Sequence, residues 1–147
     1  MKVLMNRIII ICMVVLTVCG CSKAPLNEKV EGFWMLKEFT AEGKTVKCER
    51  LYYSITRMVT EVAEKQGQNG YGAYIGRTEY RDNGKTLVVK DFKVRASTGD
   101  NGQDAPVEKL RHFGINSQEE TAFEITKCDG KEMTLTSDYA VLKLVKF

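Results

Sequence analysis

The side chains of this chain that could carry out chemistry are its cysteines, its single histidine and its tyrosines. With one histidine, no His-x-x-x-His pair can occur, and neither Gly-x-Ser-x-Gly nor Cys-x-x-Cys is present. His112 follows Arg111 and has no recognisable nucleophile or orienting acid beside it, so a role as general base has no support. We therefore predict a protein that is not an enzyme, and we assign no metal or cofactor.

Cys21 is the thiol with the most informative surroundings. Lys2 and Arg7 precede an apolar run over residues 8–18, and Val18-Cys19-Gly20-Cys21 ends it. A basic start, an apolar stretch and small residues at the cut describe a secretory signal. The run is shorter than the about 20 apolar residues of a membrane-spanning helix.

The four residues 18–21 resemble the bacterial lipobox, although Val18 and Cys19 depart mildly from its usual Leu and Ala or Ser. The resemblance implies that Cys21 is acylated and becomes the mature N-terminus. We expect a signal peptide over residues 1–20, a tether over 21–29 and one domain over 30–147. The predicted location is the bacterial cell envelope, with the lipid on Cys21 holding the chain to the outer membrane or to the periplasmic face.

The charge of the processed chain argues against nucleic acid as a partner. Removing residues 1–20 from the 147-residue chain leaves 127, and losing Lys2 and Arg7 lowers the net charge from +3 to about +1. Nucleic-acid-binding domains carry clustered basic residues. Here the basic and acidic residues alternate between positions 37 and 50, which is typical of a solvated surface.

Cys48 and Cys128 remain once Cys21 is acylated. An exported protein can form disulfides, and a bond between these two would close a loop of about 80 residues and stabilise the fold by roughly 4–5 kcal/mol. Two buried free thiols that pack as small apolar groups fit the sequence equally well. Both alternatives stay open.

Turn signals and alternating side chains predict an all-β domain. Glu42-Gly43, Asn83-Gly84 and Asp129-Gly130 are dipeptides that favour tight hairpin turns. Residues 121–128 and 131–136 alternate apolar and polar side chains, as antiparallel strands with one buried face do. The predicted strands are residues 32–41, 44–48, 51–62, 71–81, 85–96, 121–128, 131–136 and 139–146.

Some segments need a separate interpretation. Residues 57–65 also fit a helical spacing, but their β-branched content favours a strand. A bulge near Lys90-Asp91 restores the alternation of the fifth strand. Residues 97–105 are polar and predict a loop. Pro106 and Gly114 then bracket a short helix over 107–113. The sum is an eight-stranded antiparallel up-and-down barrel with one short helix before the last three strands.

Aromatic residues are the candidates for binding. Rings and hydroxyls on neighbouring strands could line an amphipathic cavity. They could equally form cross-strand pairs, which is the commoner role on a sheet. The candidate ligand-binding residues are Tyr53, Tyr71, Tyr74, Tyr80 and Phe92.

Gly32-Phe33-Trp34, at the start of the first strand, resembles the Gly-x-Trp signature of lipocalins. The order of lipobox, Gly-x-Trp strand, meander, short helix and three last strands is similar to that of small lipocalin-like bacterial lipoproteins. The resemblance implies structural roles for Gly32 and Trp34, with the tryptophan closing one end of the barrel. Lipocalins usually stack an arginine from near the last strand on that ring. Only Lys143 and Lys146 are available here, and lysine lacks the planar guanidinium.

The lead hypothesis is a membrane-anchored lipoprotein that binds a small apolar or amphipathic ligand in its barrel. The alternative is a structural or protein-interaction module whose barrel is filled by its own side chains. A void of a few hundred cubic ångströms would favour the first, and a filled interior would favour the second.

Attachment by Cys21 is directly testable. Because Cys21 is the residue placed to take the acyl chains, Cys21→Ser should release the protein from the membrane fraction, as immunoblotting of fractionated cells would show. Unchanged retention with an uncut signal would mean that residues 8–18 act as an anchor instead.

Overall fold

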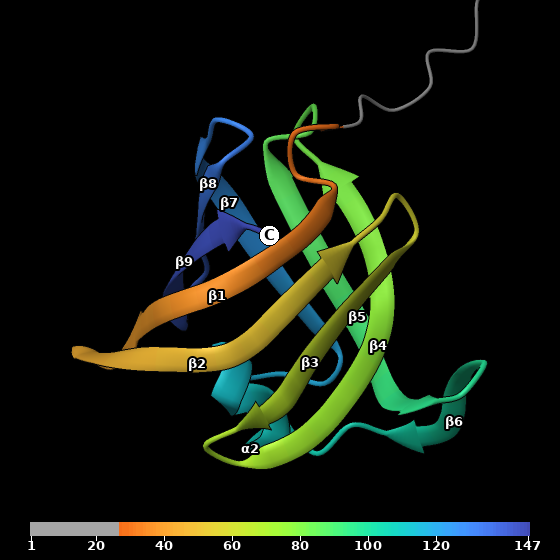
Figure 1. Ribbon diagram of the computed structural model, residues 1–147. Helices are drawn as coiled ribbons and strands as arrows, with labels where there is room; N and C mark the ends of the chain where they lie inside the picture. The colour runs from red at the N-terminus through yellow and green to blue at the C-terminus, as the bar shows by residue number, and fades with distance from the viewer. Residues whose placement is uncertain (1–26) are drawn as a thin grey trace, which may run out of the picture.

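The computed structural model describes residues 27–147, which form a ring of antiparallel strands (Figure 1). The signal peptide, Cys21 and most of the tether lie outside the described residues. Along the chain the elements are β1 (Gly32–Ala41), β2 (Lys44–Ile55), β3 (Val59–Gly67), β4 (Gly70–Arg81), β5 (Thr86–Ala96), β6 (Gly99–Asp104), α2 (Val107–Leu110), η1 (Arg111–Phe113), β7 (Glu120–Cys128), β8 (Glu132–Thr136) and β9 (Ala140–Lys146).

The barrel closes because its first strand pairs on both sides. β1 pairs antiparallel with β2 through a two-residue turn, and with β9 at the far end of the chain. The remaining pairs run β2–β3–β4–β5–β7–β8–β9. The predicted eight-stranded up-and-down barrel is therefore confirmed, and so is the short helix before the last three strands.

The predicted boundary between the strands over residues 44–48 and 51–62 was wrong. No strand ends at residue 48: β2 continues to Ile55 and bends at Arg50, whose φ is 58°. The turn comes at residues 56–58, where Thr56 donates its backbone N–H and its hydroxyl to the Val59 carbonyl (2.9 and 3.0 Å). Residues 59–67 are β3, so the strand interpretation of this region holds over the helical one.

The predicted loop over residues 97–105 is mostly a strand. β6 pairs with β5 alone and lies outside the ring, forming a hairpin that projects from the barrel (Figure 1). Its burial pattern is almost wholly exposed, so its sequence has no apolar face that would have indicated a strand.

The bulge predicted near Lys90-Asp91 is present. Asp91 has φ 56°, and the register between β4 and β5 shifts there. Gly76 lies opposite: a Cβ at this position would lie 2.7 Å from the Lys90 carbonyl oxygen and 3.0 Å from the Phe92 ring. The bulge turns Phe92 into the barrel, where it is fully buried.

Trp34 closes the end of the barrel at which the chain enters. Its ring is fully buried, and Nε1 donates to the Val30 carbonyl (2.7 Å). Lys146 Nζ lies 4.5 Å from the centre of the ring and donates to the Glu31 carbonyl (2.7 Å). Gly32 leaves room for it, since a Cβ there would lie 2.5 Å from Nζ. A lysine thus lies on the tryptophan ring, while Lys143 pairs with Glu38 (2.9 Å).

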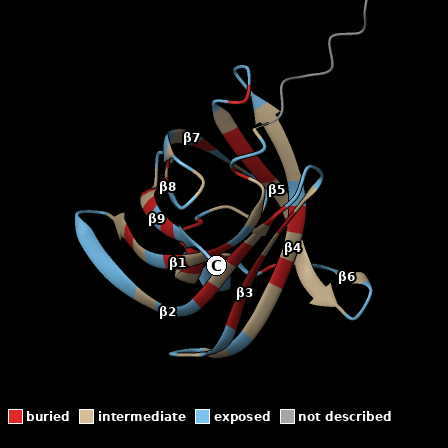
Figure 2. Cartoon of the chain, turned by 45° about the horizontal axis from the view of Figure 1, so that its top comes forward, coloured by how far each residue is buried: buried red, intermediate tan, exposed pale blue. Residues whose placement is uncertain are grey.

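The helical segment covers the opposite end. The Tyr53 hydroxyl donates to the Phe113 carbonyl (2.6 Å), and the Tyr74 and Phe113 rings meet edge to face with centres 6.3 Å apart. Between the two ends the interior is filled by buried side chains, and Figure 2 shows buried residues recurring along the strands of the barrel. They include Leu36, Val62, Leu87, Val89, Phe92, Phe123, Leu135 and Leu142.

Trp34→Ala should lower the free energy of unfolding by about 3–5 kcal/mol, because it removes a fully buried ring together with the contact to Lys146. Urea unfolding followed by circular dichroism measures this. Phe33→Ala is the matched control: Phe33 is the next residue and 58% exposed, so its loss should change stability by no more than about 0.5 kcal/mol. Equal effects of both changes would contradict the assigned role of Trp34.

Candidate functional site

A hollow of about 260 Å³ lies at the end of the barrel that η1 covers, which we call the mouth. The β1–β2 hairpin extends past the barrel and forms one wall of the hollow, and the β3–β4 turn and η1 form the others. Its apolar lining is Phe39, Val46 and Leu51. Its polar lining includes Cys48, Glu64, Asn69, Arg111 and His112. A second hollow of about 40 Å³ shares Glu64, Asn69 and His112 and adds Tyr71 and Tyr74.

Glu64 is the distinctive group of the mouth. It continues the inward-facing series of Thr60 and Val62 on β3, and it is only 5% exposed. Its carboxyl accepts hydrogen bonds from the backbone N–H of Asn69 (2.7 Å) and from the Asn69 side chain (3.3 Å). Within residues 27–147 it forms no ion pair. A buried acidic group without a cation is costly to the fold, so a carboxyl kept at a cavity wall points to a ligand.

Gly67 fixes the position of this carboxyl. A Cβ at residue 67 would lie 2.6 Å from Glu64 Oε1 and 2.7 Å from the Glu49 carbonyl oxygen. Any larger residue would push Glu64 out of place or separate β3 from β2. The end of β3 therefore packs closely only because a glycine stands there.

The charge of Glu64 acts on its neighbours. Burial, helped by Glu38 and Glu64, raises the pKa of the Cys48 thiol to about 11. Burial and Glu64 also raise the pKa of Tyr74. At neutral pH both groups are protonated: the Cys48 thiol donates to the Val46 carbonyl (3.7 Å), and the Tyr74 hydroxyl belongs to the smaller hollow. Nucleophilic chemistry by Cys48 is disfavoured, because the thiolate is the reactive form.

The disulfide considered for Cys48 and Cys128 is absent, and both are free thiols. Cys48 lines the mouth. Cys128 ends β7 opposite Met133, toward the Trp34 end of the barrel. The two thiols therefore have separate surroundings.

The structure brings together two of the five predicted aromatic residues. Tyr71 and Tyr74 both line the smaller hollow, although Tyr71 is largely exposed. Tyr53 and Phe92 lie fully buried in the core, and burial raises the pKa of Tyr53 well above its usual value. Tyr80 lies toward the Trp34 end, where its hydroxyl is buried without a hydrogen-bond partner among the described residues.

The sequence interpretation did not select Glu64, Phe39 or Leu51, which line the mouth. The sequence did contain a signal for Glu64: it is two residues beyond Val62 and four beyond Thr60, so on one strand all three side chains point to the same face. It was missed because the predicted strand ended at residue 62, two positions short of the carboxyl.

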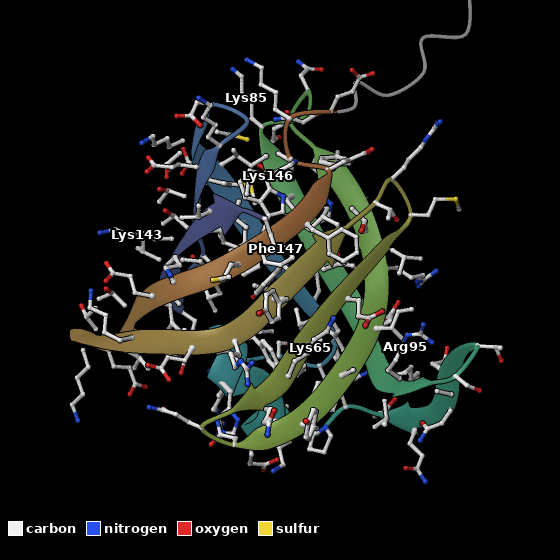
Figure 3. The ribbon with its side chains drawn as sticks, viewed as in Figure 1. Lys65, Lys85, Arg95, Lys143, Lys146 and Phe147 are labelled. Atoms are coloured by element: carbon white, nitrogen blue, oxygen red, sulfur yellow. The ribbon has the colours of Figure 1, made fainter. Side chains whose placement is uncertain are left out.

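A hollow of about 850 Å³ lies outside the barrel between β4, β5 and the β6 hairpin. Its charges are mostly satisfied by one another, as in the pairs Arg77–Asp91 and Lys93–Asp104. Arg95, labelled in Figure 3 beside this hairpin, pairs with Glu61 (3.0 Å). A shallow groove of mutually paired charges has less to offer a small ligand than the mouth does.

Residues 27–147 contain no cluster of His, Cys, Asp or Glu suited to a metal ion. They also contain no helix with the length and apolarity to cross a membrane.

Comparison with known proteins identifies the architecture. A family model described as the lipocalin-like domain matches residues 14–147. A crystal structure of a lipocalin-like protein from Bacteroides uniformis is similar, with a TM-score of 0.59 and 12% identity over 81% of this chain and 99% of that one. An uncharacterized protein from Bacteroides eggerthii has a TM-score of 0.60 and 18% identity, covering 80% and 98% of the two chains. No curated protein matches.

Cys48 should react with iodoacetamide about a hundredfold more slowly than an ordinary thiol at pH 8, because its pKa is raised from 9.0 to about 11. The rate should rise about tenfold per pH unit up to that value. Mass spectrometry of residues 22–147 carrying Cys128→Ser measures it. Glu64→Gln should increase the rate, because it removes a negative charge that opposes ionisation. A rate that levels off near pH 9 would contradict the assigned surroundings.

Proposed function

The chain belongs to the family of lipocalin-like domains, and from this premise we propose that it is a membrane-anchored barrel that binds a small amphipathic molecule at its mouth. The family and the neighbouring structures support a ligand-binding barrel. Because the barrel interior is filled, the mouth is the place for the ligand.

The buried carboxyl of Glu64 carries this proposal. Phe39, Val46 and Leu51 offer an apolar wall, and Glu64 faces the same hollow with acceptor oxygens and no cation among the described residues. The matching ligand has an apolar part and a hydrogen-bond-donating, cationic group. A charge-assisted hydrogen bond from that group would neutralise Glu64.

The size of the hollow limits the ligand. Pockets for drug-sized molecules occupy about 300–1,000 Å³, and the mouth provides about 260 Å³. The ligand is therefore small, or only its head and first few carbons are enclosed. Arg111 and Lys47 at the rim disfavour a second cationic group.

Membrane attachment belongs to the same proposal and is supported by the sequence. The lipobox-like residues 18–21 would place acyl chains on Cys21, six residues before the first described residue. The barrel would then present its binding site from the surface of a bacterial envelope membrane.

A filled interior supports a second candidate, a protein-interaction module without a ligand. In that case the wide groove between β4, β5 and β6 would meet a partner protein.

Octylamine, 1-octanol and octanoate share one alkyl chain and differ in the charge of the head group, so they separate these candidates. Calorimetric titration of residues 22–147 should show octylamine binding at least about tenfold more tightly than octanoate. Glu64→Gln should abolish that preference, because it replaces the carboxylate by a neutral amide of the same shape. Glu108→Gln, an exposed change on α2 outside the hollow, is the matched control and should retain it.

Binding of none of the three probes by a folded protein would reject the ligand site and favour the interaction module. If Glu64→Gln kept the same preference for octylamine over octanoate as the unchanged protein, the Glu64 carboxyl would not be the group that binds the ligand's head.

A further inference from the structure

We propose that the end of the barrel opposite the mouth lies against the lipid bilayer and inserts apolar side chains into its interface. This end, here called the tether end, comprises the start of β1, the turns at residues 56–58, 82–85 and 129–131, and Phe147. The inference rests on the proposed lipid attachment but concerns a different surface.

The tether end exposes large apolar side chains. Phe33 is 58% exposed, Met58 73% and Phe147 75%. Met58 stands at the tip of the turn beyond Gly32 and Ile55, which are paired in register. The Phe147 backbone N–H donates to the Phe33 carbonyl (2.9 Å), so these two aromatic residues are neighbours. Exposed apolar groups gathered at one end mark an interaction surface rather than ordinary solvated surface.

The aromatic part of this surface is held in place. The Phe147 ring meets the Tyr52 ring edge to face, with centres 5.6 Å apart, and Lys65 Nζ lies 5.5 Å from the Tyr52 ring centre. Figure 3 shows Phe147 over the outer face of β1 and β2. A positioned phenylalanine beside a tyrosine suits the membrane interface, where aromatic rings sit between the apolar and aqueous layers.

The chain arrives at this same end. Val30 is buried beneath Trp34, and the Asn27 side chain donates to the Gly84 carbonyl (3.2 Å), which fixes the last residues of the tether against the β4–β5 turn. Cys21 is six residues before Asn27. Six residues span at most about 20 Å, so a lipid on Cys21 holds the tether end close to the bilayer.

The charges here permit contact with lipid. Arg57, Lys85 and Lys131 are exposed and form no ion pair among residues 27–147, and Figure 3 places Lys85 where the chain enters. Asp82 and Asp129 accept hydrogen bonds within their own turns. With basic and acidic groups nearly balanced, insertion of apolar side chains is the main attraction, and lipid charge has a smaller effect.

This placement sets the direction of the binding site. The segment that begins with α2 lies at the end of the barrel opposite the tether end (Figure 1), and its η1 residues line the mouth, so the mouth faces water when the tether end lies on the bilayer. A ligand would therefore reach Glu64 from the aqueous side.

Co-sedimentation with phosphatidylcholine vesicles tests the surface without the lipid anchor. The chain from Ser22 contains every strand of the described barrel and its core. The triple change Phe33→Ser, Met58→Ser and Phe147→Ser should lower the vesicle partition coefficient at least about tenfold. Val46→Ser with Tyr71→Ser removes the exposed apolar residues of the mouth end and should leave it unchanged.

The lipidated protein provides a second measurement. A fluorescent label on the cysteine of Phe33→Cys should be quenched by spin-labelled lipids, and the same label on the cysteine of Val46→Cys should not. Equal quenching at both positions, or no effect of the triple change on partition, would overturn the proposal. Concentration-dependent dimers that the triple change abolishes, without vesicle binding, would assign the surface to a second copy and also overturn it. Failure of Cys21→Ser to release the chain would refute the anchor alone.

Discussion

A lysine lying on a tryptophan joins the last strand to the first, and the barrel is arranged around that closure. Lys146 contacts the Trp34 ring, donates to the Glu31 carbonyl and passes over Gly32. The contact requires three features together: the large apolar ring of Trp34, the absence of a side chain at Gly32, and the long cationic side chain of Lys146. Gly32 and Trp34 of the Gly-x-Trp signature are therefore only part of this closure, which also needs Lys146 near the end of the barrel's last strand. Lysine fills the space because its stem covers the ring while its ammonium finds a carbonyl at the rim.

Closing one end in this way determines what the other can do. With Trp34 at one end and Phe113 at the other, the residues between pack as an ordinary core. An open hollow remains at the end covered by η1, where the β1–β2 hairpin extends past the barrel. There the inward face of β3 ends on Glu64 instead of an apolar residue, and Gly67 allows β2 and β3 to stay in contact around it. The buried carboxyl of the mouth thus comes from one position of the inward-facing series on β3.

Local patterns in the sequence were enough to predict β1, the barrel order, the short helix and the bulge at Asp91, because each depends on neighbouring residues or on turn dipeptides. The turn at residues 56–58 was missed because Thr56-Arg57-Met58 contains no glycine, asparagine or proline. β6 was missed because it is polar on both faces and depends on pairing with β5. The contact of Lys146 with Trp34 and the lining of the mouth join residues far apart in the chain, and no local pattern records which distant side chains meet. The aromatic candidates illustrate this: alternation places a tyrosine on a strand, but the packing of η1 decides whether it lines a hollow or fills the core.

The pairing of β1 with β9 also has a consequence for the order of folding. β1 meets β2 across a two-residue turn, but it can meet β9 only after nearly the whole domain has been made. Contacts so distant along the chain slow folding, because most of the loop entropy must be lost before they form. Until the last residues arrive, the first strand keeps an unpaired edge that other chains could join. Loss of β9 would leave this edge of β1 open, so pairing with β9 protects β1 from edge-to-edge association as well as closing the barrel.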